Sequence, residues 1–291
     1  MSSIFTGKLF LRLRGSTCPR AGDFVRYQFN KLFLLSGEDL TLSDSFTVRH
    51  PKMRDVVRLG DGAHCEDLYW LYVITMMSEP YDNMVWLDDH GIDYQDVSPY
   101  TVFCLKWIDV KEKRLIATAE DRGCAAFSEQ VIVDALSFFL GNRAYNLRVV
   151  PSGFEIYDQS DPGWAFSEDK FELVHDFVCV VNRLDNVKRI NPATPMAKKM
   201  LIEDTRSEQK KRRKRKRKHD DTEYLGESAA ALLFSGAISS MGAIMEFGVY
   251  AMLNGGDAVN NGMRVKALLT GVYTNKIKAD SVSSDDLRWS K

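Results

Sequence analysis

Nine consecutive basic residues, Lys210 to Lys218, constrain the fold of this chain more than any other feature. Successive positions of a helix point about 100° apart. Nine adjacent cations therefore cover every face of a helix and leave no apolar side for a core. They also repel one another. We expect residues 195–220 to form a charged helix or linker.

The charge balance is asymmetric. The 291 residues include 39 Lys and Arg and 40 Asp and Glu, for a net charge of -1. Without the basic run, 30 basic residues face 40 acidic ones, so the remaining chain is acidic. Apolar residues make up 45% and charged residues 27%, which is typical of a globular protein.

Three interpretations of the basic run remain open. The first is binding to nucleic acid, with an affinity that falls steeply as salt increases. The second is a nuclear import signal. The third is pairing with an acidic surface of this chain or of a partner. No aromatic residue interrupts the run, so a base-stacking platform is not indicated. The candidate binding residues are Lys210, Lys211, Arg212, Arg213, Lys214, Arg215, Lys216, Arg217 and Lys218.

The cysteines are Cys18, Cys65, Cys104, Cys124 and Cys179. Their number is odd and none forms a Cys-x-x-Cys pair, so we expect reduced thiols with neither a disulfide framework nor a structural zinc site. The N-terminus has no basic segment followed by an apolar run. We therefore expect no secretory signal and a cytoplasmic protein.

Residues 1–50 favour strands. Lys8–Arg14 ends in alternation, Phe24–Leu35 is a second apolar run, and Ser45–Val48 is a third short strand. We predict a β-rich N-terminal subdomain over 1–50.

Residues 51–194 read as a helical domain, because helix start and stop signals recur. The predicted helices are Lys52–Leu59, Cys65–Ser78, Asp82–His90, Pro99–Trp107 and Glu129–Leu140. A β-hairpin is predicted at 147–157, and Ser167 precedes an amphipathic helix. The buried stripe of that helix is Phe171, Val174, Val178 and Val181.

The C-terminal part begins with a long helix that starts at Thr194-Pro195 and leads into the basic run. Residues 221–291 form a helical subdomain, with helices predicted at 221–235, 240–254 and 257–274. The fold class is therefore α+β, mostly helical, with a central β-hairpin. Ala230–Leu253 has one charged residue, Glu246, but its Gly and Ser residues favour packed helices over a membrane span.

Candidate chemistry is sparse. Asp88, Asp89, His90 and Asp93 are the densest group of metal-ligand types, but a polar helix end closed by Gly91 explains them. The adjacent His64 and Cys65 lack the orienting partner that nucleophilic catalysis requires. No common nucleotide-binding, zinc-protease or serine-hydrolase motif is present. We predict no enzymatic activity, no cofactor, no metal and no catalytic residue.

Several short motifs occur in a recognisable order. Asp89 to Tyr94 reads Asp-His-Gly-Ile-Asp-Tyr and is followed by Val-Ser-Pro-Tyr-Thr-Val-Phe at 97–103. The hairpin and its following helix lead into the charged stretch. Near the end stand Phe247–Leu253, Leu269–Tyr273 and Leu287–Trp289. Over residues 45–289 this order resembles the tail assembly chaperones of tailed bacteriophages. The basic run and the glycine-rich C-terminal helices depart from that pattern.

The resemblance implies a phage assembly protein of the host cytoplasm that holds the tape measure protein and recruits tail tube subunits. It brings no catalytic residues. Two alternatives remain. One is a structural virion component such as a connector, tail or baseplate subunit. The other is a nucleic-acid-binding protein that acts through residues 210–218. Membrane contact is not expected, and oligomerisation stays open.

Overall fold

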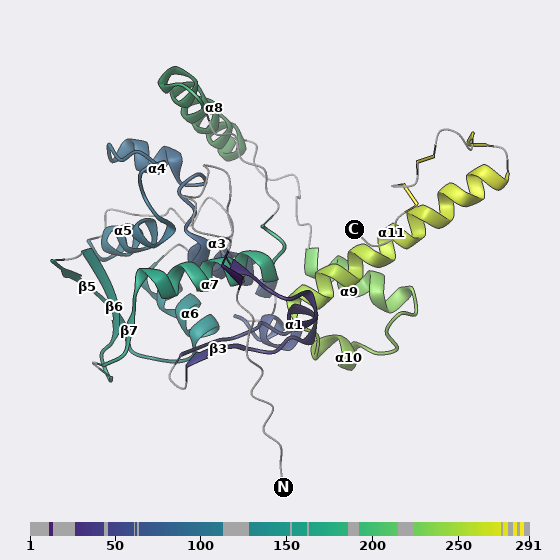
Figure 1. Cartoon of the computed structure of the whole chain (residues 1–291), viewed down its shortest axis with the longest axis horizontal. Helices are drawn as coiled ribbons and strands as arrows, with labels where there is room; N and C mark the ends of the chain where they lie inside the picture. The colour runs from purple at the N-terminus through teal and green to yellow at the C-terminus, as the bar shows by residue number, and fades with distance from the viewer. Residues whose placement is uncertain are drawn as a thin grey trace, which may run out of the picture.

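The computed structural model describes residues 12–13, 27–43, 46–60, 62, 64–112, 128–151, 153–161, 163–185, 192–214, 224–274, 276–278, 282–283 and 286–287. Helices dominate this part of the chain, and its strands form three small antiparallel sheets (Figure 1). The predicted class, α+β and mostly helical, is confirmed.

Two of the sheets lie near the N-terminus. Strand β1 (Arg12–Leu13) pairs with β2 (Tyr27–Gln28), and β3 (Leu40–Ser43) pairs with β4 (Phe46–Val48). The short strand predicted to end at Val48 is confirmed as β4. The rest of the strand predicted from Lys8 lies outside the described residues.

The strand predicted across Phe24–Leu35 is wrong in its second half, where α1 (Lys31–Ser36) forms a helix. The side chain of Asn30 caps this helix by accepting a hydrogen bond from the Leu32 amide at 2.8 Å. Gly37 ends it in the left-handed conformation, with φ at 68°. The prediction failed because an apolar run this short shows no periodicity by which a strand can be told from a helix.

The predicted helices of the central part are present, with ends shifted by a few residues. They are α2 (Met53–Val57), α3 (Cys65–Met77), α4 (Met84–Asp89), α5 (Pro99–Lys111), α6 (Glu129–Leu140) and α7 (Glu168–Val181). Hydroxyl caps begin two of them. Ser98 Oγ accepts from the Thr101 amide at 3.2 Å, and Ser128 Oγ accepts from the Val131 amide at 3.3 Å.

The predicted hairpin is confirmed and is part of a larger sheet. Strands β5 (Tyr145–Val150) and β6 (Gly153–Asp158) pair, and β7 (Ala165–Phe166) adds a third strand beside β6. The sequence did not predict β7, since a two-residue strand shows no alternation.

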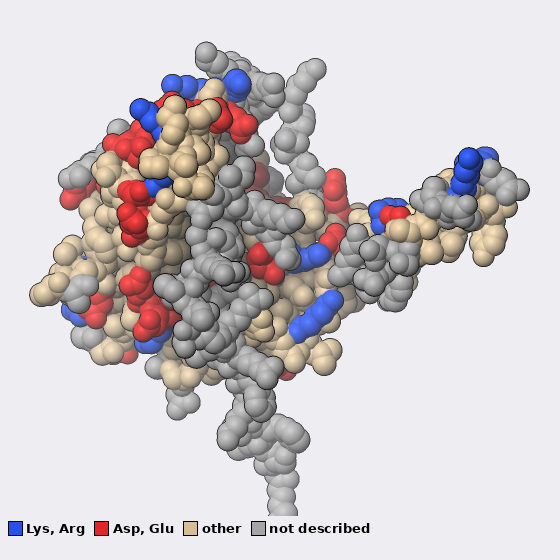
Figure 2. Space-filling view, turned by 45° about the horizontal axis from the view of Figure 1, so that its top comes forward, with Lys and Arg blue, Asp and Glu red and all other residues tan. Residues whose placement is uncertain are grey.

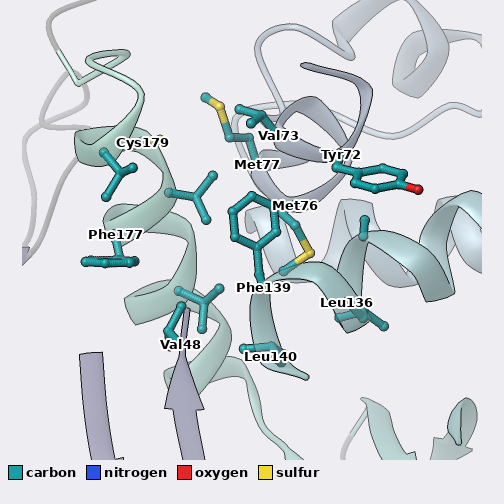
Figure 3. Close-up of a cluster of buried hydrophobic side chains, with 14 of the residues drawn as sticks. Val48, Tyr72, Val73, Met76, Met77, Leu136, Phe139, Leu140, Phe177 and Cys179 are labelled. Carbon is teal, nitrogen blue, oxygen red and sulfur yellow. The ribbon is translucent and has the colours of Figure 1, made fainter. Parts of the chain in front are cut away.

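The core lies where α3, α6, α7 and β4 meet (Figure 3). The predicted stripe of α7 faces this core, and all four of its residues are fully buried: Phe171, Val174, Val178 and Val181. Leu40 and Leu253 belong to the same cluster. One hydrophobic core therefore joins the N-terminal strands, the central helices and the start of the last helix.

The C-terminal part contains α8 (Pro195–Lys214), α9 (Tyr224–Phe234), α10 (Met241–Met245) and α11 (Val249–Tyr273). The helix break predicted at 255–256 is wrong, because both glycines lie inside α11. A Cβ at Gly256 would come within 2.8 Å of Ser228 on α9, so the missing side chain permits close packing of the two helices. Within the described residues, no helix has the length and apolarity that crossing a membrane requires.

Candidate functional site

The predicted ligand group on α4 does not gather around a common point. Asp88 and Asp89 both accept hydrogen bonds from Arg206 of α8, at 2.9 and 2.7 Å. His90 Nε2 instead lies 3.2 Å from Asp109 Oδ2 of α5, and Asp93 pairs with Lys198 of α8.

A pocket of about 480 Å³ opens beside this contact, lined in part by Asp88, Asp93 and Lys198. Below the charges, Ile202 of α8 is buried against Met84 and Leu87 of α4. The acidic group therefore helps to hold α8 on the body, with cations of α8 opposite its carboxylates.

The His64-Cys65 pair lies at the start of α3. His64 Nδ1 lies 3.5 Å from Asp67 Oδ2 at the surface, and Cys65 is the first residue of the helix. The acids of this first helical turn sit favourably at the positive end of the helix dipole. Glu66 also reaches α9, where it accepts hydrogen bonds from the Leu225 and Gly226 amides at 2.7 and 3.3 Å.

Five of the nine residues of the basic run are among those that the structure describes. Residues 210–214 continue α8 as a helix, and the side chains of Lys210 and Lys211 are exposed. Arg215 to Lys218 lie outside the described residues.

A buried polar cluster lies between α3 and α7, and sequence reasoning missed it. Its members are Glu79, His175, Asp176 and Cys179, all of them buried. His175 and Cys179 are four positions apart on α7 and so share one face of the helix. Glu79 arrives from the loop after α3, where Ser78 adopts a left-handed conformation with φ at 40°.

The imidazole of His175 is held at both ring nitrogens. Nε2 lies 2.7 Å from Glu79 Oε1 and 3.8 Å from Cys179 Sγ, while Nδ1 lies 3.0 Å from Asp176 Oδ1. Asp176 is itself fixed, because its Oδ2 accepts a hydrogen bond from the Tyr27 amide at 2.9 Å. The cluster thus joins β2, the loop after α3, and α7.

Burial and hydrogen bonding oppose each other at His175. Burial alone lowers the pKa of the ring. The hydrogen bonds with Asp176, Cys179 and Glu79 outweigh burial and hold that pKa well above its ordinary value. Burial raises the pKa of the Cys179 thiol. These two pKa directions favour a protonated imidazole beside a neutral thiol.

A second candidate is the outer part of α11. The helix packs against α9 along its first half, and Gly256 is its last buried residue. From Asn260 to Tyr273, all of which the structure describes, every residue is partly or fully exposed. This segment extends away from the body (Figures 1 and 2). We call residues 260–273 the α11 arm.

The arm exposes large apolar side chains. Met263 is 53% exposed, Leu269 39% and Tyr273 83%. Leu269 and Tyr273 are four positions apart and share a face of the helix. Figure 2 shows mostly uncharged surface along this projection, with basic side chains toward its outer end.

Comparisons with protein families, with curated proteins and with solved structures gave no match.

Proposed function

We propose that this protein is a non-enzymatic assembly factor that binds another polypeptide through the α11 arm. The observation that carries the proposal is the arm itself, a helix that leaves the core and exposes Met263, Leu269 and Tyr273 to solvent. Large apolar side chains presented together on a projecting helix are typical of protein-binding surfaces.

The base of the arm is anchored, which suits a binding role. Arg183, at the end of α7, pairs with Asp257 of α11 and approaches the Leu253 carbonyl at 3.5 Å. Leu253 belongs to the main core. A partner that binds the arm would therefore engage a helix whose orientation is already set, which reduces the entropic cost of binding.

The partner class follows from the resemblance to tail assembly chaperones. By that resemblance the partners are the tape measure protein, which is long and helical, and the tail tube protein. An amphipathic helix of the tape measure protein would pack its apolar side against the arm. The basic residues at the end of α8 supply a secondary contact for acidic surface.

The proposal is tested by removing the apolar character of the arm without touching the core. We expect Leu269→Asp combined with Tyr273→Asp to weaken binding of the tape measure protein of the same phage by about tenfold or more, since each buried apolar side chain contributes about 1.5–3 kcal/mol. Isothermal titration calorimetry would measure the change.

The control is Leu32→Asp with Val149→Asp, which places the same charges at side chains that are 76% and 73% exposed on α1 and β5. This variant should bind like the wild type. Equal affinities for the two double variants would contradict the role of the arm. Retention of the protein in purified phage particles would instead favour a structural virion subunit.

A further inference from the structure

The buried cluster between α3 and α7 has the composition of a metal site. It combines a carboxylate, an imidazole and a thiol, whose ligand atoms all lie within 4.8 Å of one another. We propose that Glu79, His175 and Cys179 bind a divalent cation of the zinc type. This inference goes beyond the proposed function and does not depend on it.

The choice of ion follows from the ligands. Calcium and magnesium prefer sets made of oxygen atoms. Zinc binds sulfur, nitrogen and oxygen together, at about 2.3, 2.0 and 2.1 Å, and is commonly tetrahedral. A mixed set that includes a thiol therefore favours zinc over the hard cations.

The geometry is close to that of a metal-bound set. In a tetrahedral zinc site, the nitrogen and sulfur ligands lie about 3.6 Å apart, and nitrogen and oxygen about 3.4 Å. The separation of His175 Nε2 from Cys179 Sγ is 3.8 Å, and that from Glu79 Oε1 is 2.7 Å. Lengthening the Nε2–Oε1 separation by about 0.7 Å would bring it to the tetrahedral value.

The surroundings orient the imidazole for this role. A metal-bound histidine commonly donates its other ring N–H to a carboxylate, which fixes the ring and its tautomer. Asp176 occupies that position at Nδ1, and the Tyr27 amide holds Asp176 in place. Nε2 is thereby directed at Glu79 and Cys179.

The charge of the cluster is preserved when the ion enters. A ligating histidine is neutral and a ligating cysteine is a thiolate, so one proton leaves the ring and one leaves the thiol. Two positive charges arrive with the ion as two protons depart.

Cobalt(II) is the direct probe, because thiolate ligation gives a charge-transfer band in the near ultraviolet and tetrahedral coordination gives visible bands. We expect the reduced full-length protein to bind one equivalent of cobalt with both signatures, and zinc to displace it. Cys179→Ser should abolish the charge-transfer band. Asp176→Asn should keep the band but weaken the affinity by roughly 10- to 100-fold, as expected for a positioning residue.

Cys104→Ser is the matched control, since Cys104 is equally buried but lies on α5 outside the cluster. Its charge-transfer band should be unchanged. Wild-type protein that is folded and reduced but shows no thiolate–cobalt band would overturn the proposal and leave a hydrogen-bonded cluster without a metal. A band that persists in Cys179→Ser, or that is lost in Cys104→Ser, would also overturn it. If Cys179→Ser does not fold, the wild-type and Cys104→Ser spectra still decide.

Discussion

At the scale of single residues, His50 shows how the N-terminal segment is fitted against the core. Its ring lies edge-on to Phe177, with centroids 5.8 Å apart, and it meets Gly248 so closely that a Cβ there would fall 2.5 Å from the ring. Nδ1 lies 3.3 Å from the Pro51 carbonyl, whereas Nε2 has no hydrogen-bond partner among the described residues. Burial lowers the pKa of His50.

Because the pKa of His50 is lowered in the folded protein, we expect acid to reduce the stability of the fold. Below about pH 6.5 the histidine of the unfolded chain takes up a proton that the folded state resists, so stability falls as pH decreases. Replacing His50 with Gln removes this contribution of the histidine to the pH dependence of stability. The destabilisation caused by His50→Gln should therefore be largest near pH 8 and smaller near pH 5.

Urea unfolding at several pH values would measure the difference. Asp39 and Lys52 are the charged groups that act on His50. Asp39→Asn, measured in parallel, separates the effect of the Asp39 charge from that of burial. A destabilisation that stays constant or grows toward acid would contradict the expected direction.

At the scale of elements, α8 is held by one buried side chain and by ion pairs around it. Ile202 is 6% exposed and belongs to the small cluster with Met84 and Leu87. Arg206 and Lys198 pair with acids on or just after α4. Ion pairs whose carboxylates are open to solvent each contribute little to stability, so the apolar contact of Ile202 dominates.

We therefore expect Ile202→Ala to loosen α8 by about 2 kcal/mol, whereas Met200→Ala, on the same helix but 58% exposed, should change stability by less than about 0.5 kcal/mol. Limited trypsin digestion would report the difference as faster cleavage within residues 198–211. Similar cleavage rates for the two variants would show that Ile202 does not hold the helix.

The helices also indicate what a sequence reveals about its fold. Helices α6 and α7 were predicted closely because a serine precedes each one and apolar residues recur every three or four positions. Helix α1 was mistaken for a strand because its apolar run is shorter than two turns. A break was wrongly predicted at Gly255 and Gly256, because these glycines serve the close contact with α9, which local sequence does not reveal.

At the scale of the whole molecule, the sequence predicted the class of fold but not the candidate sites. The His175–Cys179 spacing on a predicted amphipathic helix was the available signal, yet Glu79 lies 96 residues before His175. Only the folded chain brings the two together. The α11 arm was likewise hidden, because its exposure depends on where α9 ends.

The described part of the chain is a body with a main core and a smaller apolar cluster beneath α8, and a helix anchored to the main core projects from it (Figure 1). We expect a protein partner to bind this helix. In hydrogen–deuterium exchange of the protein with and without its proposed partner, a phage tape measure protein, the amides of residues 260–273 should become protected, while those of α3, α6 and α7 stay unchanged. Protection confined to other surfaces, with the arm unaffected, would contradict the account.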